Sequence, residues 1–294
     1  MKTPLPTIDG ISPSCLTLRR GRWKNMLEFL TERFPDVQPE TWVCRMDRGE
    51  VVDEKSVRLH TDSSYREGAR VFYYRTLDNE LPIPFEENIL YQDENLIVAD
   101  KPHFLPVVPS GRFLRETLLV RLKKKLNLED LVPIHRIDRD TAGIVIFSHN
   151  PATRSDYALL FQKRKVEKVY EALAPNLPGG HFPMIHRSCI TRGEPFFCMK
   201  EIEDKPNSET RIDVLEVRGD ATLYQLRPLT GKKHQLRVHL AALGIPIIND
   251  IIYPVVLPRA ADDFSQPLKL VAKSISFQDP ISGQNNHFES NKII

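Results

Sequence analysis

Apolar residues in the first part of the chain follow helical and then strand-like spacing. Over residues 23–34 they recur every three to four positions, which is typical of one face of a helix. A second short helix is predicted to begin after Pro39 and to bury Trp42. Extended chain is predicted at 50–52 and a strand at 70–74. This part should therefore hold two short helices followed by small strands.

The later part of the chain mixes predicted strands with a predicted helix. The apolar run 144–147 indicates a buried strand, and the alternation over 168–173 indicates another. The turn Thr230-Gly231 should lead into a helix that ends at Gly244 and has an apolar side made of Leu236, Leu240 and Leu243.

Two prolines, Pro82 and Pro84, interrupt regular structure between these parts. We therefore expect a small N-terminal domain over residues 1–84 and a larger domain over residues 85–294. With 41% hydrophobic and 27% charged residues among 294, the composition is that of an ordinary soluble protein.

Cysteine usage and the start of the chain predict a cytoplasmic protein, which we expect to be a monomer. The four cysteines form no Cys-x-x-Cys pair. Residues 1–10 lack the apolar core of a signal peptide, and no segment has the ~20 apolar residues of a membrane helix.

A cluster of ionisable residues lies at 135–143, directly before the apolar run. It holds two carboxylates, two arginines and a histidine, and burial at the start of a strand would penalise each one that lacked a partner. A functional site is predicted here, with Asp138 as the candidate catalytic residue.

Two other interpretations of this segment fit the sequence less well. A protein-kinase catalytic loop would need an Asp directly after Arg136, a glycine-rich loop upstream and an Asp-Phe-Gly downstream, and the sequence has none of these. A metal site would need more ligands, and His234 and His239 are five apart, which puts them on different faces of a helix. A zinc set of His186, Cys189 and Cys198 stays open.

The predicted helix after Thr230-Gly231 begins with two lysines, Lys232 and Lys233. Free N–H groups, the positive end of the helix dipole and these lysines could together bind phosphate, although a solvated basic helix end explains the same pattern. Arg237 lies between apolar neighbours and would be costly to bury without a carboxylate partner.

The formal net charge of only +2 does not by itself indicate a nucleic-acid partner, but the positive charge is clustered. Basic residues gather at 19–24, 112–125 and 163–168. Such clusters could form a groove for a phosphate backbone, or they could be solvated helix faces.

Residues 135–143, His-Arg-Ile-Asp-Arg-Asp-Thr-Ala-Gly, resemble the His-Arg-Leu-Asp-x-x-Thr-Ser-Gly motif of RluA-type pseudouridine synthases, with Ile137 for Leu and Ala142 for Ser. The resemblance implies that Asp138, not Asp140, is the nucleophile. It also implies that Arg136 inserts into the RNA where the target base has flipped out.

Four further segments resemble the same family. Residues 228–241 are similar to its Thr-Gly-Arg-Thr-His-Gln-Ile-Arg-Val-His-Leu-Ala block, with Lys232-Lys233 for Arg-Thr, and residues 168–173 to its Lys-x-Tyr-x-Ala-Leu segment. Weaker matches at 91–102 and 268–283 extend the resemblance over most of the larger domain.

By this resemblance, Arg237 pairs with the catalytic aspartate, and Tyr170 lines the uracil pocket and is the candidate base. Lys168 and the block Thr230, Gly231, Lys232, Lys233 and His234 would bind the substrate RNA.

The resemblance implies an α+β fold with a mixed, mostly antiparallel sheet flanked by helices, and an enzyme that isomerises a specific uridine of ribosomal or transfer RNA with no cofactor and no metal. The N-terminal domain resembles a diverged RNA-binding module, and its second helix offers Arg45 and Arg48 to phosphate. A purely structural cap is the other interpretation of this domain. A non-catalytic RNA-binding or ribosome-assembly factor on the same fold is the alternative function.

Overall fold

The computed structural model describes residues 4–75, 80–258, 260 and 263–294. The chain divides into two compact units, one made of residues 1–80 with 111–115, the other of residues 81–110 with 116–294. The predicted N-terminal domain thus includes residues 1–3 and 76–79, which lie outside the described residues. No helix among the described residues is both long and apolar enough to cross a membrane.

The first unit packs two short helices against a three-stranded antiparallel sheet of order β1-β3-β2. Its elements are β1 (Ser14–Thr17), α1 (Met26–Arg33), α2 (Pro39–Asp47), β2 (Val51–Asp53) and β3 (Arg70–Tyr73). Helix α1 begins at Met26 because the Asn25 side chain accepts a hydrogen bond from the Glu28 N–H, which caps the helix. Trp42, Leu30 and Met46 are buried in one cluster, as the apolar spacing predicts.

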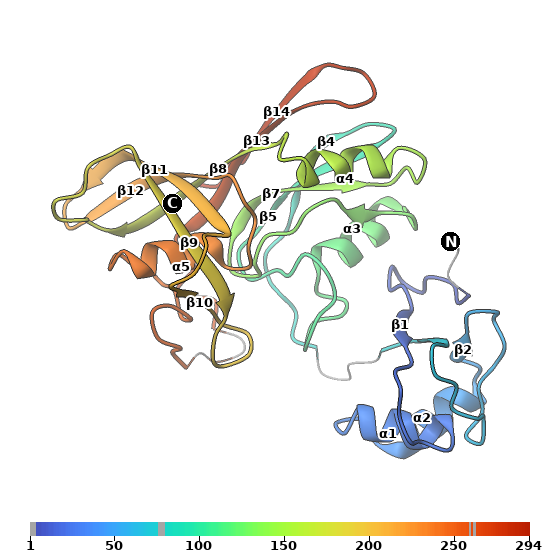
Figure 1. Cartoon of the computed structure of the whole chain (residues 1–294). Helices are drawn as coiled ribbons and strands as arrows, with labels where there is room; N and C mark the ends of the chain where they lie inside the picture. Colours follow the sequence, from blue (N-terminus) through green and yellow to red (C-terminus); the bar gives the residue numbers. More distant parts are fainter. Residues whose placement is uncertain (1–3, 76–79, 259, 261–262) are drawn as a thin grey trace. The chain divides into compact units, whose positions relative to one another are not determined.

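The second unit is built on an eleven-stranded sheet (Figure 1). Its main path has the order β10-β9-β11-β12-β8-β13-β7-β5-β4, with β14 on β13 and β6 on β7. The strands are β4 (Asn88–Gln92), β5 (Leu96–Lys101), β6 (Val132–Pro133), β7 (Ala142–Ser148), β8 (Glu167–Pro175), β9 (Met184–Arg192), β10 (Met199–Ile202), β11 (Ser208–Arg218), β12 (Ala221–Pro228), β13 (Leu270–Gln278) and β14 (Asn285–Glu289).

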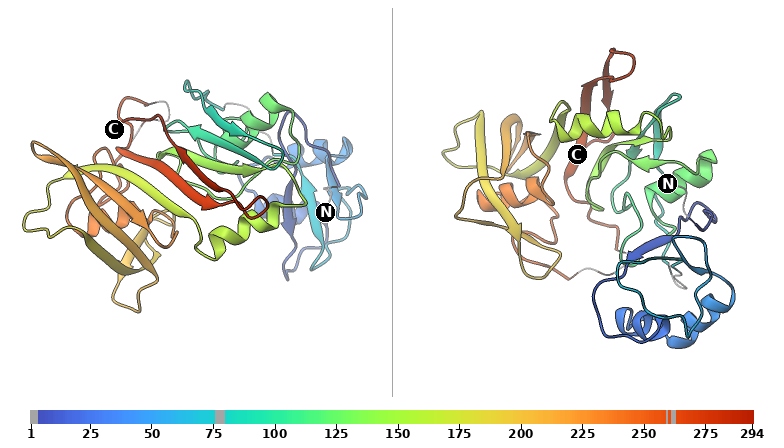
Figure 2. Two further views of the ribbon diagram at one scale, coloured as in Figure 1. Left: turned by 90° about the horizontal axis from the view of Figure 1, so that it is seen from above. Right: turned by 45° about the vertical axis from the view of Figure 1, so that its right-hand side comes forward.

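The pairing of this sheet confirms the predicted fold class. Strands β7 and β13 are parallel, and the other described pairings are antiparallel. Three helices accompany the sheet: α3 (Leu118–Leu126), α4 (Arg154–Gln162) and α5 (Gln235–Ala242). Figure 2 shows α5, in orange, against the strands β9 to β12, and its Leu236 and Leu240 are buried in the core beside Tyr224 of β12.

A close approach of backbones fixes the start of β7. Gly143 pairs with Ala272 of β13 and has a φ of 109°, and a Cβ built on it would lie 2.2 Å from the Ala272 carbonyl oxygen. Only glycine fits this position without moving a strand. On its other side Ala272 is in register with Tyr170 of β8, so one residue of β13 lies between Gly143 and Tyr170.

Candidate active site

The charged segment before β7 is a loop held from several directions. The His135 ring accepts a hydrogen bond from the Ile146 N–H at 3.1 Å and stacks on Phe161. Burial lowers the pKa of His135 to about 3, which keeps the ring neutral and able to accept. The fully buried Lys101 donates from Nζ to the carbonyl of Arg139 at 3.0 Å, which fastens the loop to β5.

Asp138 faces two donors from α5 and its N-cap. Arg237 Nη1 lies 3.6 Å from Oδ2, and His234 Nε2 lies 3.9 Å from Oδ1. The Asp138 side chain is 27% exposed. Each carboxylate oxygen therefore has its own nitrogen partner at a distance longer than a good hydrogen bond, and the group keeps access to solvent.

Arg237 has a second and closer partner in Asp250. Its side chain is 2% exposed, and Nε and Nη2 bond to the two Asp250 oxygens at 2.7 and 2.6 Å. Asp250 Oδ1 also accepts from the N–H groups of Ile252 and Tyr253. Burial disfavours the charge, but the hydrogen bonds and charge of Asp250 raise the pKa of Arg237, so the guanidinium stays ionised.

Asp140, the other aspartate of the motif, is engaged elsewhere. It is buried, and its Oδ1 accepts from Arg139 Nε at 3.2 Å. Its carbonyl oxygen lies 2.7 Å from Nδ1 of His103. The two aspartates therefore have separate surroundings, and Asp138 is the one that shares Arg237 with Asp250.

Tyr170 and Lys168 lie on β8. Burial, with a further contribution from the charge of Asp138, raises the pKa of Tyr170, so the phenol keeps its proton in the free protein. A protonated phenol can stack on a nucleobase and donate a proton. A phenol that acts as a general base must first lose its own proton. Lys168 Nζ donates to the Thr230 carbonyl at 3.4 Å, and burial lowers its pKa.

The segment 230–234 differs from the prediction, because α5 begins only at Gln235. His234 occupies the N-cap with a φ of 56°, a left-handed conformation that cannot continue a helix. The Gln235 side chain accepts from the Lys232 N–H at 3.0 Å and from the Thr230 hydroxyl at 2.7 Å. The prediction that the helix begins with the two lysines after Thr230-Gly231 is therefore wrong, while phosphate binding by this segment stays a prediction; Lys232 is exposed.

Several basic residues singled out in the sequence are not exposed. Lys123 is 7% exposed, and Arg121 is paired with Glu87 and Glu116. In the first unit, Arg45 is 6% exposed and lies over the Trp42 ring at 4.7 Å, so it is not available to phosphate. Arg48, Arg136, Lys124, Lys125 and Lys233 remain exposed.

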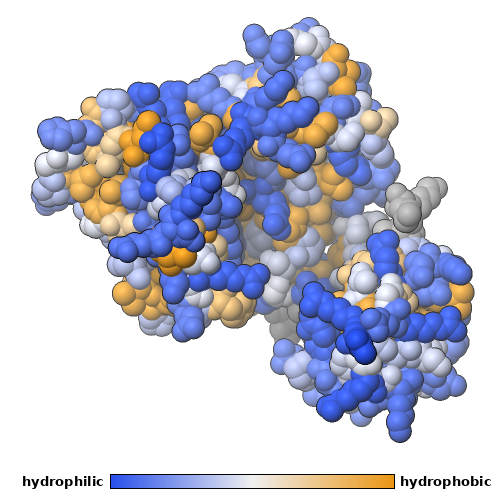
Figure 3. Space-filling view, viewed as in Figure 1, coloured by the Kyte–Doolittle hydropathy of each residue, from blue (hydrophilic) through white to orange (hydrophobic). Residues whose placement is uncertain are grey.

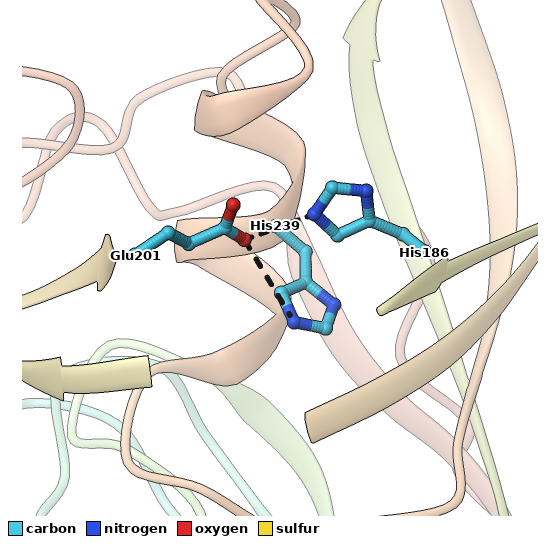
Figure 4. Close-up of side chains that lie close together, drawn as sticks. All are labelled: His186, Glu201 and His239. Carbon is cyan, nitrogen blue, oxygen red and sulfur yellow. Dashed lines mark hydrogen bonds and ion pairs between the residues drawn. The ribbon is translucent and has the colours of Figure 1, made fainter. Parts of the chain in front are cut away.

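His186, Glu201 and His239 converge from β9, β10 and α5 (Figure 4), and their candidate ligand atoms lie within 4.8 Å of one another. His186 Nε2 bonds to Glu201 at 2.9 Å. His239 Nε2 lies 3.0 Å from the Ser208 hydroxyl oxygen and 3.2 Å from that of Ser188, so two hydroxyl groups already contact this nitrogen of His239. Among the described residues its buried Nδ1 has no partner, whereas metal-bound imidazoles use that atom in an outer hydrogen bond. The cluster is best described as hydrogen-bonded packing.

The zinc set left open by the sequence is not assembled. Of that set only His186 belongs to the cluster, while the Sγ of Cys189 accepts from Asn207. His234 and His239 lie on different sides of α5, as their spacing predicts: one faces Asp138 and the other Ser208.

Sequence comparison places the chain in a family. The model of the RNA pseudouridylate synthase family matches residues 95–242, which is half of the chain and includes the loop before β7 and α5. The chain belongs to the RNA pseudouridylate synthase family.

Relatives and solved structures agree with this family. The chain is 35% identical to human pseudouridylate synthase RPUSD2 over 60% of its length, but that match spans only 32% of the human protein. It is 29% identical to an uncharacterized RNA pseudouridine synthase of Synechocystis, over 78% of this chain and 79% of the relative. The structure of human RNA pseudouridylate synthase domain containing 1 covers 70% of this chain and 84% of its own, with a TM-score of 0.57 at 25% identity.

Proposed function

We propose that this protein converts a uridine of structured RNA into pseudouridine, with Asp138 as the nucleophile. The observation that carries the proposal is the position of Asp138, which is partly open to solvent and faces Arg237 and His234. A buried cation close to a carboxylate can aim it while one side stays free for a substrate.

The proposed reaction moves one bond and leaves the RNA otherwise unchanged. The bond between uracil N1 and the ribose breaks, a bond from uracil C5 to the same ribose carbon forms, and the C5 hydrogen leaves as a proton while N1 gains one. No electrons are gained or lost overall. We expect activity to persist in excess EDTA, since the proposed chemistry uses a carboxylate nucleophile and needs no Lewis acid.

A uridine stacked in RNA must leave the stack before its glycosidic bond can reach Asp138. The exposed Arg136 precedes the nucleophile by two positions and is suited to fill the vacated place. Tyr170 would stack on the flipped uracil, and its raised pKa favours a role as a proton donor over that of a base in the resting enzyme.

RNA contact outside the pocket would come from exposed cations. In Figure 3 the second unit is hollowed between the part formed by α5 with β9–β12 and the part formed by β4, β5 and β7, and hydrophilic side chains line its rim. Lys232, Lys233, Lys124 and Lys125 are exposed in this unit and could neutralise phosphates. We expect ribosomal or transfer RNA as the substrate and a monomer acting in the cytoplasm, where the four free cysteines would stay reduced.

The test is tritium release from RNA labelled at C5 of uridine, with Asp138→Asn compared with Asp140→Asn. We expect wild-type protein to release tritium, Asp138→Asn to bind RNA without release, and Asp140→Asn to retain substantial activity. Release by Asp138→Asn near the wild-type rate would refute the assignment. Wild-type protein that binds RNA tightly and releases nothing would favour the non-catalytic binding factor.

A further inference from the structure

The hydroxyl of Tyr253 lies between a backbone N–H and the His234 ring. It accepts from the N–H of Met199 at 2.8 Å and lies 2.7 Å from His234 Nδ1. The tyrosine is 7% exposed, and these are the two hydrogen-bond contacts of its hydroxyl among the described residues. Burial raises the pKa of Tyr253 to about 12, so the hydroxyl keeps its proton at neutral pH.

Counting protons fixes the direction of the second hydrogen bond. The Met199 N–H is a donor and uses a lone pair of the Tyr253 oxygen. If His234 Nδ1 also donated, the hydroxyl proton would be buried without an acceptor, which is costly. The hydroxyl therefore donates to Nδ1, and Nδ1 carries no proton.

The position of the remaining ring proton follows. Burial lowers the pKa of His234, so the ring is neutral and has a single proton. With Nδ1 accepting from Tyr253, that proton is on Nε2, the nitrogen that lies 3.9 Å from Asp138 Oδ1. In the opposite tautomer a lone pair would face the carboxylate and repel it.

We propose that Tyr253 is a positioning residue for the reaction: its hydroxyl holds His234 in the Nε2–H tautomer, so that a ring N–H faces the Asp138 carboxylate. This inference rests on the proposed function. Tyr253 itself touches no reacting atom. The His234 ring faces Oδ1 at 3.9 Å and the Arg237 guanidinium faces Oδ2 at 3.6 Å, so the two oxygens of Asp138 are approached by different groups.

The first test reads the tautomer directly. Nitrogen-15 NMR of histidine-labelled protein, with the His234 signals assigned by their loss in His234→Gln, should report protonated Nε2 and bare Nδ1 in the wild type. Tyr253→Phe should give a mixture of tautomers. The matched control is Tyr224→Phe, because that buried hydroxyl also accepts from a backbone N–H, of Leu177, and donates to a carbonyl, of Pro175.

The second test measures turnover. Tyr253→Phe should lower kcat by roughly tenfold, about the effect of one lost neutral hydrogen bond, with KM for RNA little changed. Tyr224→Phe loses as many hydrogen bonds, so it should lose comparable stability while keeping kcat. A purely structural role of Tyr253 would give the two variants the same kinetics at matched folded fraction.

A pair of substitutions at His234 separates the effect of backbone strain on stability from the effect of the side-chain donor on turnover. Asn tolerates the left-handed φ of 56° at this position better than Gln does, so His234→Asn should be the more stable variant. The Gln amide can reach the place of Nε2, whereas the shorter Asn amide reaches only that of Nδ1. His234→Gln should therefore be the more active of the two at matched folded fraction.

The following results would contradict either the inference or the proposed function on which it rests. A wild-type Nδ1–H tautomer, an unchanged tautomer in Tyr253→Phe, or wild-type kcat in Tyr253→Phe would overturn the inference, as would a more active His234→Asn. Wild-type protein that releases no tritium would instead overturn the proposed function, and the NMR result would still test the tautomer.

Discussion

Arg237 connects two regions of opposite character. Toward Asp250 it forms a closed pair, with two hydrogen bonds of 2.6 and 2.7 Å between side chains that are 2% and 1% exposed. Toward Asp138 the closest approach is 3.6 Å, and the carboxylate is 27% exposed. The same guanidinium is therefore rigidly bound on one side and loosely engaged on the other.

Asp250 holds Arg237 in place, whereas Asp138 stays free to react. A carboxylate in a closed bidentate pair has its lone pairs occupied by donors, as Asp250 has, and is a poor nucleophile. Asp138 receives the field of a fixed cation without giving up its oxygens to it. The closed pair holds the guanidinium still, so the open side can keep its geometry without tight contacts.

The largest effect should come from removing the shared cation. Arg237→Met should lower kcat on the order of 10²–10³-fold, because Asp138 loses its fixed positive charge. It should also lower the free energy of unfolding by about 3–5 kcal/mol, since Asp250 is left buried and unpaired. Tritium release and urea unfolding measure the two effects. The double variant with Asp138→Asn should be little slower than Asp138→Asn alone, and fully multiplicative losses would contradict a shared unit.

A change on the Asp250 side of Arg237 should reduce the stability of the protein more than its turnover. Asp250→Asn keeps the oxygen that accepts from Ile252 and Tyr253 but removes the charge, so we expect unfolding to become easier by about 2 kcal/mol. kcat should fall about tenfold, because Arg237 is less firmly aimed. Asp213→Asn is the control, since Asp213 also pairs with an arginine through two bonds but at an exposed site. Equal destabilisation in both variants would mean that burial of the Arg237–Asp250 pair contributes nothing to the free energy of unfolding.

The smallest effect on stability should come from the open side. Asp138→Asn should change the free energy of unfolding by less than about 0.5 kcal/mol, because the lost contact is long and partly solvated and Arg237 keeps Asp250. Thermal unfolding of the purified variant measures this. A loss of stability as large as that of Asp250→Asn would show that the contact of Arg237 with Asp138 stabilises the protein as much as its contact with Asp250 does.

The sequence predicted several of the elements and part of the site. The strand β7, the apolar side of α5 and both helices of the first unit follow from local spacing, because each buries one regular face. The apolar neighbours of Arg237 also indicate that it needs a carboxylate partner. They do not identify Asp250 as that partner, because Asp250 lies in the chain after α5 and no local sequence pattern places it beside Arg237.

Two other misses have the same origin. The sequence predicts that the helix after Thr230-Gly231 begins with Lys232 and Lys233, because a turn before a basic stretch is typical of a helix start, but the left-handed His234 delays the helix to Gln235. Lys123 belongs to the basic cluster 112–125 that could bind phosphate, although the side of α3 that carries it is buried. In both cases tertiary packing overrides a composition signal.

The place of Ala272 in the sheet has a consequence for the order of events during synthesis. Its strand lies between β7, which follows the Asp138 loop, and β8, which carries Tyr170, and Ala272 is in register with both Gly143 and Tyr170. Both segments are made before the strand that joins them. A nascent chain that stops before residue 270 has every residue of the proposed chemistry but lacks the strand that lies between β7 and β8. We therefore expect the proposed site to reach its final geometry only after β13 has paired with both strands.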